Sequence, residues 1–280
     1  MYILFGKEKN ISQMKGFIFY VFFLWIFFVV GGFLLIFYWY RTHQVMWRIE
    51  NPPPSSSSPH GTTIPKLIFQ TWKSKHDVPA LYQNTRRETQ RLHPHYQFLL
   101  WDDEDNRRFI QDYYPSFLSV YDEYDQPIKR VDAVRYFFLY HFGGIYMDLD
   151  SVALRSFDPL MEGKDCLFGC QYPRGKDAVD AVPNCFMASV PRHPFFEYVI
   201  HQLKHTRDLD VLRATGPVFL TSCLRKWHDP QPLSRIRTIV PFGVLYTHTW
   251  KHRSKNIDWD DYRDKYPGAY ATTLWTASWM

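Results

Sequence analysis

Two acidic side chains at the end of an apolar, β-prone segment constrain this chain more than any other feature. The segment reads Gly-Gly-Ile-Tyr-Met-Asp-Leu-Asp over residues 143–150. Residues two positions apart on a strand point to the same face, so we expect Asp148 and Asp150 to project together from one strand end. An unpaired carboxylate in such a hydrophobic context would cost free energy. Paired oxygen ligands of this kind suit Mg²⁺ or Mn²⁺, so the sequence predicts a divalent metal site.

A long apolar stretch near the N-terminus predicts a membrane anchor. Phe17 to Tyr40 carries no charged side chain and is long enough to cross ~30 Å of hydrocarbon as a helix. A slight excess of lysine before this stretch predicts a cytosolic N-terminus and a lumenal remainder. We therefore expect a cytosolic tail at 1–16, a transmembrane helix at 17–40, a Pro/Ser-rich stem at 41–63 and a folded domain at 64–280.

Bulk composition excludes two classes of site. The formal net charge of +5 is spread out, without the dense basic run that nucleic-acid binding would need. The four cysteines include no Cys-x-x-Cys pair, so a zinc site is not expected. An oxidising lumen would permit disulfides, but their pairing stays open.

Apolar runs of strand and helix character alternate along the folded domain. This alternation predicts an α/β fold with a mixed, largely parallel sheet, in which ligands bind at the carboxyl ends of strands. The predicted strands are 66–71, 96–101, 145–149, 166–171, 185–189 and 238–242. The predicted helices are 78–92, 104–114, 116–124, 127–142, 193–205 and 217–227.

Several polar and aromatic residues near these strand ends are candidates for ligand contacts. Asp132 and Arg135 share a helix face, which alone would indicate a surface ion pair of little energetic value. Their helix directly precedes the acidic strand, so Asp132 could hold a sugar hydroxyl and Arg135 could offset diphosphate charge. Trp72 follows the first strand, either as a core aromatic or as a stacking surface for a nucleotide base. Ser278 and Trp279 are expected to form a lid.

Four motifs in this order resemble those of one enzyme family. They are Ile-Pro-Lys-Leu-Ile-Phe-Gln-Thr-Trp at 64–72, Val-Asp-Ala-Val-Arg-Tyr at 131–136, the acidic segment at 143–150 and Ala-Thr-Gly-Pro at 214–217. The chain resembles the DXD-containing sugar-transferase family of fungal initiating outer-chain mannosyltransferases and inositol phosphoceramide mannosyltransferases. Residues 156–160 and 184–196 are most similar to the inositol phosphoceramide subgroup.

The resemblance implies a GT-A fold, a nucleotide-sugar donor and a divalent cation, Mn²⁺ or Mg²⁺. It places Asp148 at the ribose and metal-bound water, and Asp150 on the metal itself. Asp148, Asp150 and Arg135 would form the catalytic set. The residues expected at the donor are Trp72 on the base, Asp132 and Arg135 on the sugar and phosphates, Tyr146 and Asn184 in the pocket, and Ser278 and Trp279 over the diphosphate.

The expected activity is retaining transfer of a hexose, mannose from GDP-mannose, to a glycolipid such as inositol phosphoceramide. The expected location is the Golgi or endoplasmic reticulum membrane, with a single span and a lumenal catalytic domain. Outer-chain mannosyl transfer to glycoprotein N-glycans is an alternative, as is a catalytically silent membrane-anchored binding subunit. Carboxylates alone would also suit a metal-dependent phosphatase or nuclease, but such enzymes need further ligands for a second metal.

Overall fold

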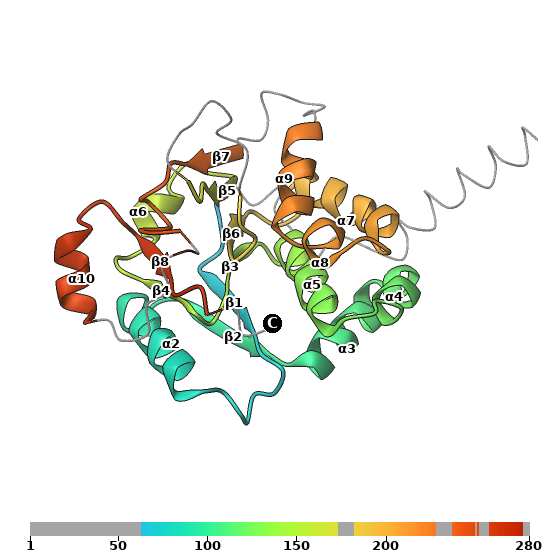
Figure 1. The fold of residues 1–280 in the computed structure, drawn as a ribbon, viewed down its shortest axis with the longest axis horizontal. Helices are drawn as coiled ribbons and strands as arrows, with labels where there is room; N and C mark the ends of the chain where they lie inside the picture. Colours follow the sequence, from blue (N-terminus) through green and yellow to red (C-terminus); the bar gives the residue numbers. More distant parts are fainter. Residues whose placement is uncertain (1–62, 173–181, 228–236, 250, 252–257, 277–280) are drawn as a thin grey trace, which may run out of the picture. The chain divides into compact units, whose positions relative to one another are not determined.

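The computed structural model describes residues 63–276 with the exception of 173–181, 228–236, 250 and 252–257 (Figure 1). The predicted tail, the predicted transmembrane helix and nearly all of the predicted stem lie outside the described residues, as do Ser278 and Trp279. Across the described part of the chain, no helix is both long and apolar enough to cross a bilayer.

Six strands form the central sheet in the order β2-β1-β3-β6-β5-β7. β1 pairs in parallel with β2 and β3, and β5 pairs in parallel with β7, whereas β6 runs antiparallel to both of its neighbours. The prediction of an α/β fold with a mixed, largely parallel sheet is therefore confirmed. The strands are β1 Leu67–Thr71, β2 Gln97–Trp101, β3 Gly144–Met147, β5 Cys166–Gly169, β6 Phe186–Ser189 and β7 Arg237–Val240.

The strand order changes direction at β1. The chain passes from β1 to β2 on one side and then returns to lay β3 along the other side of β1. β1 and β3 are parallel, so their carboxyl ends lie at the same edge of the sheet. In α/β sheets this kind of switch point is where ligands bind. Trp72 follows β1 here and Asp148 follows β3.

Helices cover the sheet in two groups on opposite sides (Figure 1). The larger group packs against a core rich in aromatic residues that includes Phe69, Tyr146 and Phe168. The second side packs against Ile68 and Ile145, which alternate with residues of the first core because successive strand side chains point to opposite faces. The larger group comprises α3 Asp103–Tyr113, α4 Pro115–Asp122, α5 Pro127–His141, α7 Pro194–Thr206, α8 Val211–Ala214 and α9 Pro217–Lys226; the other comprises α2 Ala80–Leu92 and α6 Asp158–Met161. α10 Trp259–Lys265 has no buried residue and contacts α2 rather than the central sheet.

Two glycines make the connection from α5 into β3. Gly143 has φ +67° and Gly144 has φ +93°, values that L side chains rarely adopt. A Cβ at Gly144 would lie 2.6 Å from the Leu67 carbonyl oxygen of the neighbouring β1. The glycine pair therefore allows both the sharp turn and the close approach of β3 to β1.

A second, two-stranded sheet lies beyond the end of β3. β4 Ser151–Ala153 pairs antiparallel with β8 Ala271–Thr273. The Ser151 and Thr273 hydroxyls lie 2.8 Å apart within it. Neither strand was among those predicted, because each has only three residues and lacks a hydrophobic run. This small sheet brings the late part of the chain next to the acidic segment.

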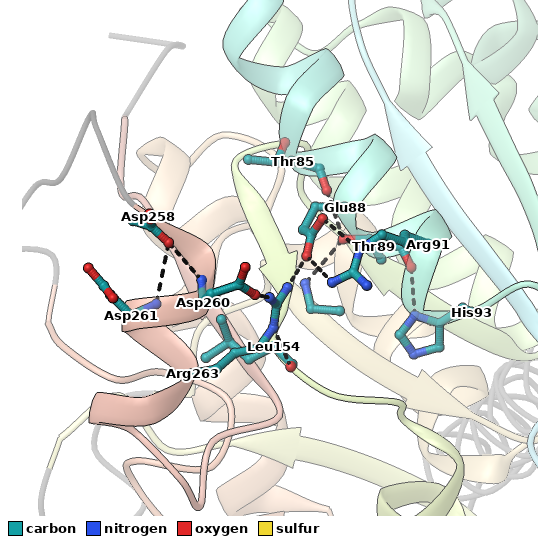
Figure 2. Close-up of polar contacts among 11 residues, drawn as sticks. Thr85, Glu88, Thr89, Arg91, His93, Leu154, Asp258, Asp260, Asp261 and Arg263 are labelled. Atoms are coloured by element: carbon teal, nitrogen blue, oxygen red, sulfur yellow. Dashed lines mark hydrogen bonds and ion pairs between the residues drawn. The ribbon is translucent and has the colours of Figure 1, made fainter.

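Arg263 on α10 links its own helix to α2 and to the segment that follows β4 (Figure 2). The Arg263 guanidinium pairs with Glu88 of α2 and with Asp260. Its Nε also donates to the Leu154 carbonyl oxygen over 3.0 Å. These contacts tie α10, which precedes β8, to α2 and to the segment after β4.

Candidate functional site

The two acidic residues lie in a turn and not on a strand. The predicted strand 145–149 ends at Met147 as β3, so the expectation that Asp148 and Asp150 share a strand face was wrong. The Asp148 N–H donates to the Cys185 carbonyl oxygen over 2.9 Å, and the Ser151 N–H donates back to the Asp148 carbonyl oxygen over 3.0 Å. The second bond closes a tight turn, which ends the strand at the first carboxylate.

One oxygen of Asp148 is held by two neighbours. Its Oδ1 accepts a hydrogen bond from the Tyr146 hydroxyl over 2.8 Å and lies 3.3 Å from the Arg135 guanidinium. Its Oδ2 has no hydrogen-bond partner among the described residues, and the side chain is 34% exposed. Asp148 therefore has one anchored oxygen and one oxygen available to a ligand.

Asp150, like Asp148, has one of its two carboxylate oxygens held by hydrogen bonds. The donor residue lies at the far end of the described chain. Its Oδ2 accepts from the Thr276 N–H over 2.9 Å and from the Thr276 hydroxyl over 2.8 Å. No described side chain bonds its Oδ1. Burial, and after it the negative charge of Asp148, raise the pKa of Asp150 to about 6. The two carboxylates are thus close enough to repel each other, a repulsion that a cation would relieve.

Asp132 and Arg135 form a buried ion pair on α5 behind this turn. Their side chains are 7% and 3% exposed, and the two charged groups lie 2.7 Å apart. Arg135 also donates to the Asn184 carbonyl oxygen over 2.9 Å and stacks 4.4 Å from the centroid of the Tyr146 ring. Burial raises the pKa of Asp132 to about 6 even though Arg135 opposes the rise. The pair is not the exposed, weak one that helix spacing alone would indicate.

Trp72 lies half-buried at the carboxyl end of β1. Its Nε1 donates to the Asp77 carbonyl oxygen over 2.8 Å. Its ring meets Tyr82 of α2 edge-to-face, with the centroids 5.0 Å apart. The hydroxyl of Thr71, the residue that precedes Trp72, lies 3.3 Å from the Tyr146 hydroxyl. This contact links the ends of β1 and β3.

The structure brings most of the predicted site residues together. The α5 pair, the acidic turn and Asn184 are joined by the direct contacts of Arg135 and Tyr146. Trp72 reaches Asp150 only indirectly, through Tyr82 and Thr276. The Tyr82 hydroxyl lies 2.9 Å from the Thr276 hydroxyl, which in turn donates to Asp150. Ser278 and Trp279 cannot be placed, because they lie outside the described residues.

Charge and ligand type at this turn fit a divalent cation. Asp132, Asp148 and Asp150 supply three carboxylates, and among the described residues Arg135 is the one cationic side chain paired with them, which leaves an excess of negative charge. No cluster of three or more histidine, cysteine, aspartate or glutamate side chains suited to a metal occurs in the part of the chain that is described. A metal here would take two protein carboxylates and fill its other positions with phosphate oxygens or water, as Mg²⁺ commonly does.

Three residues that hold the acidic turn were missed from the sequence. The Thr85 hydroxyl on α2 donates to the Leu149 carbonyl oxygen over 2.5 Å, and Tyr82 and Thr276 reach Asp150 as described above. Tyr82, Thr85 and Thr89 form the buried face of α2. For Tyr82 and Thr85, the available signal was their polar character on the buried face of an amphipathic helix, since such groups need hydrogen-bond partners. Thr276 lies outside any helix and gave no such signal.

We expect metal affinity at this site to fall as the pH drops through about 6. The folded protein holds protons on Asp132 and Asp150 more tightly than the unfolded chain does, because both pKa values are raised to about 6. This contribution to the stability of the metal-free fold is complete below the ordinary pKa of 3.8 and is lost as the pH rises through about 6. Coordination of a metal by Asp150 would require its ionised carboxylate, so we expect the affinity to decrease up to about tenfold per pH unit below 6. Thermal unfolding with and without Mn²⁺ at about pH 5 and pH 7.5 measures this. An equal Mn²⁺-induced rise in Tm at both values would contradict it.

Comparison with known proteins confirms the resemblance seen in the motifs. The family model described as the glycosyltransferase sugar-binding region containing DXD motif matches residues 79–167, which include α5 and the acidic turn. The mannosyl phosphorylinositol ceramide synthase CSH1 of Saccharomyces cerevisiae is 36% identical over 206 residues, covering 70% of this chain and 53% of that protein. Inositol phosphoceramide mannosyltransferase 3 of Schizosaccharomyces pombe is 37% identical over 195 residues, covering 66% of this chain and 52% of that protein.

A shorter match is to the initiation-specific alpha-1,6-mannosyltransferase of Candida albicans, 27% identical over 110 residues, covering 37% of this chain and 29% of that protein. The chain spans about half the length of the ceramide-related proteins that it matches.

Proposed function

We propose that this chain, a relative of the DXD glycosyltransferases through residues 79–167, is a metal-dependent, retaining glycosyltransferase of the GT-A type. It transfers a hexose, mannose from GDP-mannose, to a glycolipid acceptor such as inositol phosphoceramide. The observation that carries the proposal is the acidic turn, where Asp148 and Asp150 each have one anchored oxygen and one without a partner among the described side chains. The names of the relatives support the choice of sugar and acceptor.

The acidic turn and α5 have different roles at the donor: the turn binds the metal, and Arg135 of α5 positions the carboxylates. Asp148 and Asp150 hold Mn²⁺ or Mg²⁺, which when bound stabilises the negative charge on the departing nucleoside diphosphate. Arg135 is almost wholly buried and already contacts Asp132, Asp148 and Asn184, so it acts mainly by fixing the carboxylates. Any contact between Arg135 and the diphosphate would require these bonds to rearrange.

The remaining predicted donor residues take the roles that the resemblance implies. Trp72 stacks on the base, and Asp132 and Asn184 line the sugar pocket. Tyr146 is buried and contributes through its hydroxyl, which orients Asp148. Ser278 and Trp279 close over the diphosphate, and the N-terminal segment anchors the enzyme in a Golgi or endoplasmic reticulum membrane.

Outer-chain mannosyl transfer to an N-glycan is the second candidate. The match to the initiation-specific mannosyltransferase favours it, although that match covers a smaller share of both chains and has lower identity. The nature of the acceptor separates the two candidates, because the donor chemistry is the same.

A ligand panel followed by a transfer assay tests the proposal. Purified full-length chain is screened for thermal stabilisation by GDP-mannose, GDP, UDP-glucose and UDP-galactose, with and without Mn²⁺. At a ligand concentration one hundred times Kd, binding adds about 2.7 kcal/mol, or about 5–10 °C in Tm for a domain of this size. We expect this rise for GDP-mannose only when Mn²⁺ is present.

Product analysis then identifies the acceptor. Inositol phosphoceramide in mixed micelles and a high-mannose N-glycan are offered with radiolabelled donor, and the products are separated by mass. Mannosylated glycolipid supports the first candidate and an extended N-glycan the second. Absence of both donor binding and turnover with every sugar nucleotide, at saturating Mn²⁺, would contradict the proposed function.

A further inference from the structure

The second acidic residue of the turn depends on a short chain of hydrogen bonds that begins on α2. The Tyr82 hydroxyl lies 2.9 Å from the Thr276 hydroxyl, which lies 2.8 Å from Oδ2 of Asp150. The Thr276 N–H reaches the same Oδ2 over 2.9 Å. Two donors from one residue therefore converge on a single carboxylate oxygen.

The direction of these bonds follows from the number of protons. A threonine hydroxyl has one proton, and Thr276 gives it to the Asp150 carboxylate, which can only accept. The Tyr82 hydroxyl must then be the donor to Thr276. Each bond in such a series polarises the next, so the tyrosine strengthens the bond that Thr276 makes to Asp150.

The backbone of the turn is anchored separately from the Thr276 hydroxyl. The Leu274 N–H donates to the Asp150 carbonyl oxygen over 2.9 Å, and the Thr85 hydroxyl donates to the Leu149 carbonyl oxygen. Loss of the Thr276 hydroxyl would leave these bonds and the Thr276 N–H in place. The hydroxyl therefore controls the orientation of the carboxylate more than the path of the chain.

We infer that Thr276 and Tyr82 are positioning residues, which hold Oδ2 of Asp150 so that Oδ1 is presented to a divalent cation. This inference rests on the proposed function, because it concerns how the same metal site is prepared. Tyr82 also connects the metal site to Trp72, the residue proposed to stack on the nucleotide base, because the two rings pack edge-to-face. Neither residue touches the substrate in this scheme.

Three variants of the full-length chain test the inference by metal binding. Thr276→Val keeps the shape and the N–H but removes the hydroxyl, Thr276→Ser restores the hydroxyl, and Tyr82→Phe removes only the first donor. Loss of a residue that orients a metal ligand typically costs 10–100-fold in metal affinity. We expect a loss of about that size for Thr276→Val, a smaller loss for Tyr82→Phe and near-normal affinity for Thr276→Ser.

Mn²⁺ affinity is measured by electron paramagnetic resonance in the presence of GDP, with the Mn²⁺ dependence of transfer as a second readout. Thr273→Val is the matched control, because it removes a buried hydroxyl in β8 that bonds Ser151 and the Cys185 thiol and not Asp150. It should bind Mn²⁺ as the wild type does. Tyr82→Phe keeps the test valid if Thr276→Val does not fold.

The outcomes separate this inference from the proposed function. Normal Mn²⁺ affinity in both Thr276→Val and Tyr82→Phe, with affinity lost in Asp150→Asn, would overturn the positioning role and leave the function standing. A loss in Thr273→Val as large as in Thr276→Val would also overturn it, because the effect would then be structural. Failure of the wild type to bind Mn²⁺ with GDP would overturn both.

Discussion

Asp150→Asn is expected to abolish sugar transfer while making the metal-free protein more stable. Removing one preorganised electrostatic group typically costs about 10²–10³-fold in rate, and loss of the bound cation would cost at least as much. The stabilisation arises because Asp150 is forced to ionise beside Asp148 at neutral pH, with its pKa raised to about 6. An asparagine oxygen can still accept both Thr276 bonds. We expect a gain of about 1–2 kcal/mol in the free energy of unfolding at pH 7.5.

Chemical denaturation and a transfer assay on the same preparations measure the two effects. At about pH 4.5 the gain in stability should shrink, because the wild-type carboxyl is then largely protonated. Asp112→Asn, which changes an exposed carboxylate on α3, serves as the control. An Asp150→Asn protein with near-normal turnover would show that this carboxylate is not needed for the reaction.

Arg135→Met is expected to destabilise the fold strongly. The side chain is 3% exposed and is the only guanidinium that contacts Asp132 and Asp148 among the described residues. Its removal leaves Asp132 buried without a counter-charge, which costs about 3–5 kcal/mol when one partner of a buried pair is lost. The Asn184 carbonyl oxygen and the face of the Tyr146 ring also lose their partner.

A double mutant separates charge from packing. Asp132→Asn combined with Arg135→Met should recover a large part of the loss, because the uncompensated charge is gone. Arg108→Met is the surface control: its side chain is 63% exposed and pairs with Glu104, so it should change stability by less than about 1 kcal/mol. Equal effects of Arg135→Met and Arg108→Met in urea unfolding would refute the buried-pair argument.

The sheet was predictable because its strands are short apolar runs closed by polar or turn residues. β1, β2 and β3 begin within one residue of their predicted starts, and the alternation of strands with helices indicated the largely parallel sheet. β4 and β8 were missed, because three-residue strands carry too little hydrophobic pattern. The end of β3 was placed two residues too late, since its last positions look β-prone but the bond from Ser151 to Asp148 closes a turn.

The acidic pair and Arg135 could be predicted from short stretches of sequence, whereas the residues that hold the acidic pair in place could not. Asp132 and Arg135 stand three residues apart, and Asp148 and Asp150 stand in one motif, so spacing alone brought each pair to notice. Thr276 lies 126 positions from Asp150 along the chain and belongs to no motif. A contact of that separation depends on the pairing of β4 with β8, which no local pattern in the sequence specified.

The pairing of β4 with β8 has a consequence for how the protein matures. A nascent chain leaves the ribosome with the acidic motif long before the residues that hold Asp150 have been translated. Until residues 271–276 emerge and dock, the motif is present but its second carboxylate is unsupported. We therefore expect a polypeptide released early, at residue 270, to lack the support of Asp150 even if its central sheet has formed, so that the acidic turn is completed only after that sheet.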